Sequence, residues 1–324
     1  MLFGTLRMET VMTARAAMAT RFEILLHGEN ATALRAAGEA ALDEVERLEG
    51  QLSLYRPTSE IRRVNRHAAR EPVRVSPPIF RLLLQVQQLW RETGGAFDPT
   101  VLPLVRAWGF MGGAAGRRPD AQALAEAQTC VGMNRVELDP RNFTVRFARE
   151  GMALDLGAIG KGYAVDCAAE ILVEAGVTSA FMHGGTSSCF ALGRPPDTPR
   201  WKAAIPDPRP ERTATASGRD LLLAEIPLGN ESLGVSAIWG RFFTAAGRTY
   251  GHVLDPRLGE PVQRAWLAAV VLTSAAESDA LSTALLTLGV DGLELLARFR
   301  PGVRALVMAP AEVAGEFRLI KRGL

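Results

Sequence analysis

The segment 155–162 places one carboxylate, three glycines and one lysine directly before an apolar, helix-like stretch. Glycines let the backbone approach a ligand closely, and the N-terminus of a helix presents unpaired N–H groups to an anion. Lys161 adds a positive point charge. The pattern therefore suits the binding of an anionic group, although an ordinary turn between a strand and a helix would also produce it.

Two common phosphate-binding motifs do not fit this segment. A Walker A loop requires Ser or Thr after its lysine, but Gly162 follows Lys161, and Asp155 occupies the position of the first glycine. The spacing of Gly157, Gly160 and Gly162 also differs from the G-x-G-x-x-G pattern of dinucleotide-binding folds. An anion held here would have to be bound in another way.

A second candidate site begins at Ser274 and Glu277, whose spacing matches a capping box at the start of a helix. Asp279 and Thr283 are four residues apart and therefore lie on one face of that helix. One carboxylate and one hydroxyl on adjacent turns suit a hard cation such as Mg²⁺, which binds oxygen ligands. A solvated helix face is the structural alternative.

Three glycine-rich turns add further candidates. His252 precedes a tight turn at Asp255-Pro256 and could accept a proton near neutral pH, although a lone histidine is more often structural. Gly184-Gly185 follows an expected strand and offers backbone N–H groups to an anion. The segment 95–98 places bare backbone beside an aromatic ring and a carboxylate, which suits a flat heterocycle. A simple turn is the alternative in each case.

The composition excludes several classes of function. The chain has 324 residues and a formal net charge of +2, which gives no broad electrostatic case for binding nucleic acid or a membrane surface. Its three cysteines form no Cys-x-x-Cys pair, so a cysteine-based zinc or iron–sulfur site is not expected. The segment 1–20 has no continuous apolar core, and no stretch is typical of a transmembrane span. We therefore expect no signal peptide, no membrane segment and a cytoplasmic protein.

The expected secondary structure favours the α+β class, because strands and helices follow one another without a regular β-α-β period. We treat 1–324 as a single domain, with 194–212 as the place where two subdomains would be separated. The segment 53–61 is expected to be a polar turn, and 112–120 a loop. Helices are expected over 31–51, 77–93, 161–175, 275–288 and 293–299, and strands over 22–27, 136–147 (a hairpin), 179–183, 201–205, 221–226, 233–237, 242–245, 266–272, 303–308 and 317–321.

Taken together, these motifs resemble the ApbE family of FAD:protein FMN transferases. The resemblance implies an α+β fold of mixed sheets and packed helices, related to the T-fold. The matching motifs occur in the family's order over nearly the whole chain: Met18-Ala19-Thr20, Ser53-Leu54-Tyr55 with Ser59 and Asn65, 95–100 with Trp108-Gly109-Phe110, 155–166, Gly184-Gly185, His252 with Asp255-Pro256 and Gly259, and 279–283.

The resemblance also implies a reaction. Enzymes of this family bind FAD with Mg²⁺, transfer its FMN moiety to a Ser or Thr hydroxyl of a target flavoprotein, and release AMP. By this resemblance His252 is the base for the acceptor hydroxyl, Lys161 supplies charge, and the metal is held by the Ala158 carbonyl and the side chains of Asp279 and Thr283. The residues expected to contact FAD are Met18, Tyr55, Ala96, Phe97, Asp98, Asp155, Lys161, Gly184, Gly185 and Ser236.

The sequence departs from the family in three places. Val235 and Ala237 flank Ser236, where the family usually has Thr-Ser-Gly, and Thr186 stands where Asp or Asn is common. The lipoprotein signal of many members is absent from the sequence, so a cytoplasmic acceptor is expected. Two alternatives use the same site: a FAD pyrophosphatase that gives FMN and AMP, and a flavin-binding protein without turnover. The sequence does not indicate the acceptor's identity or the oligomeric state.

Overall fold

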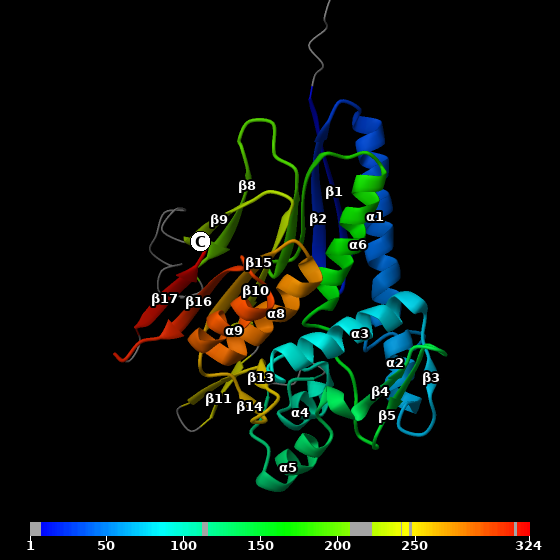
Figure 1. Ribbon diagram of the computed structural model, residues 1–324, viewed down its shortest axis with the longest axis vertical. Coiled ribbons are helices and arrows are strands. Elements are labelled where there is room, and N and C mark those ends of the chain that lie inside the picture. The colour runs from blue at the N-terminus through cyan, green and yellow to red at the C-terminus, as the bar shows by residue number, and fades with distance from the viewer. Residues whose placement is uncertain (1–7, 112–115, 208–221, 241, 246–247, 314–315) are drawn as a thin grey trace, which may run out of the picture.

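The computed structural model describes the chain except for residues 1–7, 112–115, 208–221, 241, 246–247 and 314–315. Its centre is an eight-stranded sheet in which every neighbouring pair of strands is antiparallel (Figure 1). In order across the sheet, the strands are β1 (Glu9–Ala17), β2 (Thr20–Gly28), β6 (Ser179–Gly184), β7 (Ser188–Leu192), β10 (Glu231–Ala237), β15 (Leu267–Leu272), β16 (Arg304–Pro310) and β17 (Phe317–Arg322).

Four small sheets and the helices surround this sheet. The small sheets contain β3 (Val73–Arg74), β5 (Thr144–Phe147) and β4 (Val136–Asp139); β8 (Trp201–Pro206) and β9 (Leu222–Leu228); β11 (Phe242–Ala245) and β12 (Arg248–Gly251); and β13 (Leu254–Asp255) and β14 (Glu260–Pro261). The α-helices are α1 (Ala31–Leu52), α2 (Glu60–His67), α3 (Pro77–Glu92), α4 (Leu102–Ala107), α5 (Ala121–Thr129), α6 (Gly160–Glu174), α8 (Ala275–Leu288) and α9 (Gly292–Phe299).

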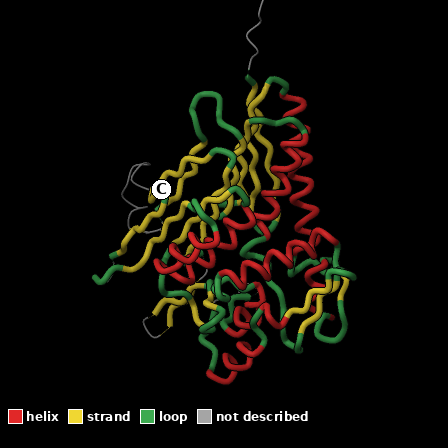
Figure 2. Tube along the Cα trace, in the orientation of Figure 1, coloured by secondary structure: helices red, strands yellow, loops and turns green. Residues whose placement is uncertain are grey.

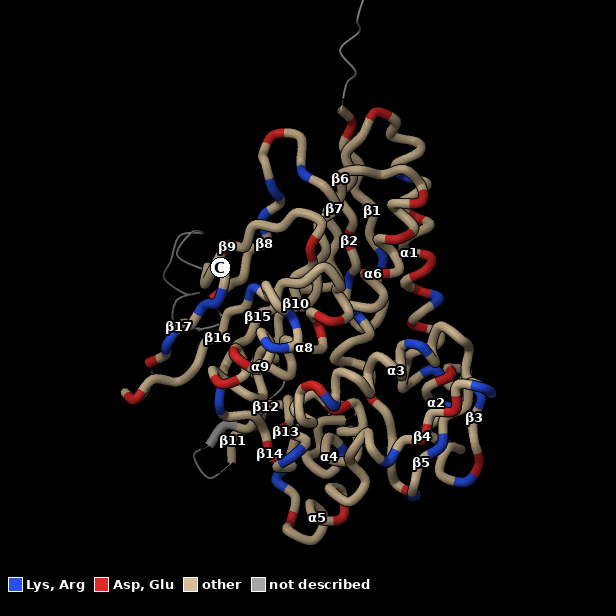
Figure 3. Tube along the Cα trace, viewed as in Figure 1, with Lys and Arg blue, Asp and Glu red and all other residues tan. Residues whose placement is uncertain are grey.

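Helices and strands are arranged in two parts (Figure 2). Helices α1, α6 and α8 cover one face of the large sheet, whereas α2 to α5 form a second group with the small sheet β3-β5-β4. The described chain thus has the α+β organisation expected from the sequence. Acidic and basic residues are interspersed along it (Figure 3), in agreement with the near-zero net charge.

The large sheet separates two hydrophobic cores, and β15 shows how. Because successive side chains of a strand point to opposite faces, Ala268 and Val270 pack into the core beneath α1, α6 and α8. Leu267 and Ala269 pack into the other core, together with Trp201 of the β8–β9 hairpin. The hairpin begins inside the segment 194–212, part of which lies outside the described residues. The division into subdomains at this segment stays a prediction.

Helix α8 lies directly on β10. A Cβ atom at Gly234 would come within 2.2 Å of the Ser278 carbonyl oxygen, so only glycine permits this approach. Hydroxyl pairs join the two elements on either side of Gly234: Ser232 with Ser278 at 2.7 Å, and Ser236 with Ser282 at 2.8 Å. The depth and the register of the helix are therefore both fixed.

Helix α6 packs against the start of α8 in the same close manner. A Cβ atom at Gly162 would lie 2.1 Å from the Ala275 carbonyl oxygen. The carboxylate of Asp166, one turn further along α6, accepts the backbone N–H groups of Ala275 at 2.6 Å and Ala276 at 2.9 Å and the hydroxyl of Ser274 at 2.8 Å. A negative charge at a helix N-terminus is stabilising, and here it also sets the position of α6 relative to α8.

Arg300, at the C-terminal end of α9, connects the second group of helices to α8. Its Nη2 lies 2.7 Å from Oε1 of Glu277 on α8 and 3.1 Å from Oε2 of Glu92, the last residue of α3. The guanidinium side chain is only 19% exposed. Because the chain continues from Glu92 into the segment 95–98, this ion-pair network links that segment to α8.

Most expected elements are present, but the structure adds several that the sequence analysis missed, among them α2, α5 and β1. Helix α2 occupies the end of the expected polar turn and the residues that follow it, and it buries only Ile61 and Val64, too few apolar residues to reveal a helical period. Helix α5 has no fully buried residue, and only Leu124 and Ala127 pack partly buried against a core cluster, which is too weak a pattern to reveal a helix. Strand β1 pairs only with β2 at the edge of the sheet. The expected loop at 112–120 lies partly outside the described residues.

One apolar segment was not anticipated as a candidate membrane span. Ala275–Phe299 is long and apolar enough to cross a membrane, judged by length and composition alone. In the structure it comprises α8, a short 3₁₀ turn (Gly289–Asp291) and α9, and 61% of its most apolar window is buried inside the molecule. Packing into the core accounts for its hydrophobicity, so membrane insertion is not needed to explain it.

The close approach at Gly234 predicts a strong effect of one added methyl group. Gly234→Ala should lower the free energy of unfolding by about 1–3 kcal/mol, because the methyl group collides with backbone rather than with a mobile side chain. Gly50→Ala adds the same group to α1 where no atom lies within 4 Å, and it should leave stability unchanged or raise it by up to about 1 kcal/mol. Equal urea midpoints for the two variants would contradict this account.

Candidate active site

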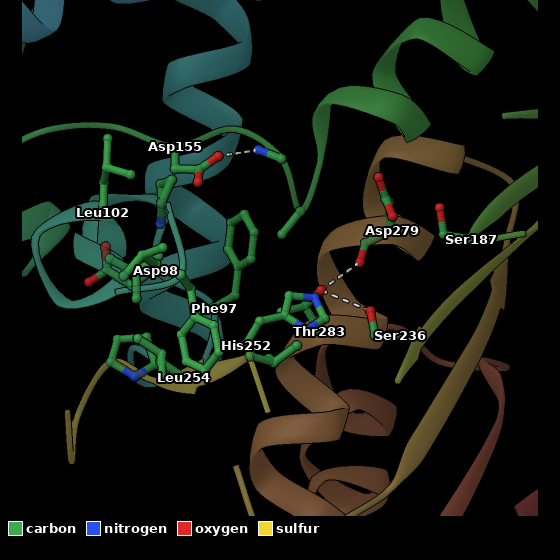
Figure 4. A pocket seen from close by; sticks show the side chains of 18 of the residues that line it. Phe97, Asp98, Leu102, Asp155, Ser187, Ser236, His252, Leu254, Asp279 and Thr283 are labelled. Carbon is green, nitrogen blue, oxygen red and sulfur yellow. Dashed lines mark hydrogen bonds between the residues drawn. The ribbon is translucent and has the colours of Figure 1, made fainter. Parts of the chain in front are cut away.

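A cavity of about 370 Å³ lies between the large sheet and the second group of helices (Figure 4). Its walls come from segments far apart in the sequence: the loop before α6, the N-terminal half of α8, the end of β10, the segment 96–99 and the loop after β12. Among the residues predicted from the sequence, those that line it are Tyr55, Ala96, Phe97, Asp98, Asp155, Ala158, Lys161, Ser236, His252, Asp279 and Thr283.

Asp279 and Thr283 present oxygen atoms to the cavity from consecutive turns of α8 (Figure 4). The Asp279 side chain is almost fully buried, and its Oδ2 accepts the N–H of Gly162 at 3.1 Å. The Thr283 hydroxyl lies 2.9 Å from the Ser236 hydroxyl and 3.4 Å from the Asp279 carbonyl oxygen. The contacts that seat α8 therefore also orient its two functional side chains.

The loop before α6 supplies the opposite polar wall. Asp155 is anchored by its own N–H, which donates to the Pro99 carbonyl at 2.6 Å, while its Oδ1 accepts the N–H of Gly157 at 2.8 Å. The Lys161 ammonium donates to the Gly157 carbonyl at 3.1 Å, so the side chain folds back over the loop toward the cavity. Helix α6 has no side-chain cap at its N-terminus. This end of the cavity is thus equipped for an anion.

Two carboxyl groups of the cavity are perturbed by burial. Desolvation raises the pKa of Asp155, while the Gly157 N–H and the positive charge of Lys161 act in the opposite direction. Desolvation also raises the pKa of Asp98, against hydrogen bonds that include the Thr100 N–H at 2.8 Å. Such buried acids are costly to ionise, and perturbed acids of this kind cluster at functional sites.

The remaining walls are apolar and aromatic, and sequence reasoning missed much of them. Phe97 is buried beside the cavity, whereas Tyr55 is 63% exposed at its edge. Leu102 and Val105 of α4 complete this side. Helical spacing would have placed both on one face of α4, but nothing in the sequence indicates that the face meets a site. Ser187, which follows the Gly-Gly turn, also lines the cavity and was not singled out.

His252 lines the cavity from the loop between β12 and β13. A distant contact anchors the next turn, between β13 and β14, because the indole N–H of Trp108 donates to the Gly259 carbonyl at 2.8 Å. Both oxygens of the Asp255 carboxylate are engaged by the Arg257 guanidinium, at 2.7 and 2.9 Å. Asp255 thus holds the turn between β13 and β14, whereas the preceding loop contributes His252 to the cavity.

Three predicted residues are not among those that line the cavity. Met18 lies in the turn between β1 and β2, where Met18 and Ala19 have positive φ angles of 51° and 58°. The neighbouring turn between β6 and β7 contains Gly185, and a Cβ atom there would lie 2.4 Å from the Thr20 hydroxyl oxygen. Close packing of the two turns accounts for the glycine at 185, and for Gly184, whose Cβ would lie 2.7 Å from the Phe22 ring.

The donor set at α8 fits a hard cation better than a soft one. Asp279 and Thr283 contribute a carboxylate and a hydroxyl oxygen, and the loop residue Ala158 lines the same cavity and has a backbone carbonyl. No group of three or more His, Cys, Asp or Glu side chains that could hold a metal occurs among the described residues. A Zn²⁺-type site is therefore not seen there, whereas sparse oxygen ligands are what Mg²⁺ accepts.

Comparison with known proteins agrees with this geometry. The model of the ApbE family matches residues 13–307. A FAD:protein FMN transferase of Treponema pallidum is 32% identical over 291 residues, which cover 84% of this chain and 77% of that protein. One of Haemophilus influenzae is 30% identical over 270 residues, which cover 80% of this chain and 75% of that protein.

Two solved structures share the fold. The ApbE protein of Thermotoga maritima superposes with a TM-score of 0.84 at 26% identity, covering 97% of both chains. The apo flavinyl transferase ApbE of Pseudomonas stutzeri superposes with a TM-score of 0.82 at 27% identity, covering 98% of this chain and 96% of that one. The resemblance predicted from the motifs is thus confirmed over nearly the whole length: this chain belongs to the ApbE family.

Proposed function

We propose that this chain is a FAD:protein FMN transferase, which moves FMN from FAD to a Ser or Thr hydroxyl of an acceptor flavoprotein and releases AMP. One observation carries the proposal: Asp279, Thr283, Lys161 and His252 come from three distant segments and line one cavity. Such a cavity offers anion-binding, cation-binding and proton-accepting groups together. The names of the relatives, FAD:protein FMN transferases, agree with this function.

We propose that Mg²⁺ is held by the Asp279 carboxylate, the Thr283 hydroxyl and the Ala158 carbonyl. When bound, such a cation neutralises charge on the pyrophosphate of FAD and makes the phosphorus easier to attack. Lys161 adds a second positive charge on the other side of the same cavity. Stabilisation of the charge that develops during phosphoryl transfer is the largest task of such a site.

The protein's own residues then position the reactants. Phe97, Leu102 and Val105 provide an apolar wall for the flat isoalloxazine ring, and Tyr55 closes its edge. The acceptor oxygen forms a bond to the FMN phosphorus as the bond between that phosphorus and the AMP oxygen breaks. His252 accepts the proton that the hydroxyl loses, and AMP carries away the negative charge of the broken bond.

Incubation with FAD and Mg²⁺ tests the proposal directly. A peptide or domain with an acceptor threonine should gain the mass of FMN while AMP appears in equal amount, and intact-mass spectrometry with nucleotide chromatography measures both. The protein without acceptor is the control. FMN and AMP formed equally well without acceptor would identify a FAD pyrophosphatase instead, and unchanged FAD in every reaction would contradict any turnover.

Asp279→Asn tests the proposed metal site. The amide oxygen can still accept the Gly162 N–H, so the fold should persist, but the charge that attracts the cation is lost. We expect AMP release to fall by at least about 100-fold, with a weaker dependence on added Mg²⁺. Asp43→Asn, at a side chain that is 70% exposed on α1, is the matched control and should remain active. Full activity of Asp279→Asn would remove Asp279 from the site.

Asp155→Asn tests the buried carboxyl without requiring activity. Because burial raises its pKa, the folded state holds this proton more tightly than the unfolded chain does. Stability is therefore lost as the pH rises from the ordinary carboxyl pKa through the raised one. Asn carries no such charge, so its stability relative to wild type should be greater at pH 7 than at pH 4, measured by urea unfolding without ligands. If the free energies of unfolding of the variant and the wild type differ by the same amount at pH 4 and pH 7, the pKa of Asp155 is not raised.

A further inference from the structure

A second cavity of about 500 Å³ adjoins the first. The two share three lining residues, Ser187, Val235 and Ala237. Its outer wall is β8, which contributes the segment 202–206, and its inner wall is the region around the turn between β6 and β7. The two cavities therefore adjoin at the end of β10, and the second forms a groove beneath the β8–β9 hairpin.

His252 stands where the two cavities meet. Its side chain lines the first cavity, and Gly240 lines the second. A Cβ atom at Gly240 would lie 4.0 Å from Cε1 of the His252 ring, which is ordinary contact distance. The imidazole therefore lies in the first cavity and next to a residue that lines the second.

The shared wall contains a backbone edge that extends beyond its partner strand. Strand β10 pairs with β7 only as far as Gly234 opposite Ser188. The Val235 N–H makes one further bond on that edge, to the Ser187 carbonyl at 2.7 Å, and the Ile238 N–H donates to the other side, to Trp266. Because hydrogen-bonding directions alternate along an antiparallel strand, the Ala237 N–H points toward the edge left by β7.

The geometry of the transfer reaction indicates from which direction the acceptor hydroxyl must enter. In a phosphoryl transfer the attacking and leaving oxygens lie roughly in line on opposite sides of the phosphorus. FAD and its departing AMP occupy the first cavity under the proposed function, so the acceptor hydroxyl must enter from another direction. The second cavity offers such a direction, because Gly240 in its lining is in contact distance of the His252 ring.

We infer that the acceptor flavoprotein binds through an extended segment that lies in the second cavity along the edge of Val235–Ala237 and delivers its Ser or Thr hydroxyl to His252. This inference rests on the proposed function. Backbone hydrogen bonds to a strand edge are a common way to bind an extended peptide. Phe181, Leu233 and Leu267 give the groove an apolar floor for alternate side chains.

The charged side chains of the groove indicate which acceptor segments it would bind best. His183 and Lys202 line it, and its described lining contains no Asp or Glu. Both side chains have a carboxylate partner just outside the groove, His183 with Glu23 at 3.3 Å and Lys202 with Glu225 at 2.5 Å. A segment with small neutral or acidic residues around its hydroxyl would therefore bind better than a basic one.

Ala204→Trp tests the groove without touching the catalytic cavity. Ala204 is exposed on β8 and lines only the second of the two cavities, so a bulky side chain there should block the groove while the fold survives. With a threonine peptide that the wild type modifies, we expect the KM for the peptide to rise at least about 10-fold. The kcat at saturating peptide and the affinity for FAD, followed by flavin fluorescence, should stay unchanged. Lys321→Trp, at an exposed position on β17, is the control.

Cross-linking supplies a second measurement if Ala204→Trp does not fold. The same peptide with a photoreactive residue next to its threonine should label 181–189 or 201–206 of the wild type, as read by mass spectrometry. Absence of transfer by the wild type would contradict the proposed function itself. If folded Ala204→Trp transfers FMN with an unchanged KM for the peptide, the proposed binding groove is wrong although the proposed function stands. The same holds if the wild type transfers FMN but the cross-links form only outside these two segments. Weakened FAD binding by Ala204→Trp would assign the groove to the flavin and overturn it too.

Discussion

The contact of α8 with the backbones of α6 and β10 is the constraint on which the rest of the structure depends. Two glycines, Gly162 and Gly234, remove the side chains that would hold these elements apart. Asp279 directly follows the second contact point, Ser278, and its Oδ2 accepts the Gly162 N–H. The position of its carboxylate is therefore set by close backbone packing in the core, and no flexible loop is needed to place it.

This arrangement explains why local patterns predicted some of the site well. The capping sequence at Ser274 and the spacing of Asp279 and Thr283 are properties of a single helix, and the side chain of Ser274 accepts the Glu277 N–H at 3.2 Å as expected. The loop at 155–161 is likewise held by contacts within itself, from Gly157 to Asp155 and from Lys161 to Gly157. Where one element is sufficient to specify a feature, its sequence could be interpreted correctly.

Features that depend on two distant segments could not be predicted in this way. Trp108 and Gly259 meet through a hydrogen bond that spans 151 positions, and no local pattern in the sequence indicates that they are partners. Gly185 resembled an anion-binding nest, yet its local packing against Thr20 already requires a glycine. Leu102 was an ordinary apolar residue until the fold brought α4 to the cavity. The family resemblance supplied part of this missing information, because motif order reflects tertiary contacts.

The hydroxyl groups beneath the site have a consequence for the direction of their protons. If the lone pairs of Thr283 bind a cation, its proton must be donated elsewhere, and the Ser236 oxygen lies 2.9 Å away. Ser236 then donates to Ser282 at 2.8 Å, and Ser282 donates to the Asp279 carbonyl at 2.8 Å. A cation bound to the Thr283 oxygen thus orients the hydroxyls of Thr283, Ser236 and Ser282 in one direction. The chain of hydrogen bonds ends on the backbone carbonyl of Asp279, the other proposed side-chain ligand. The hydrogen bonds beneath the site therefore share one direction, and each polarises the next.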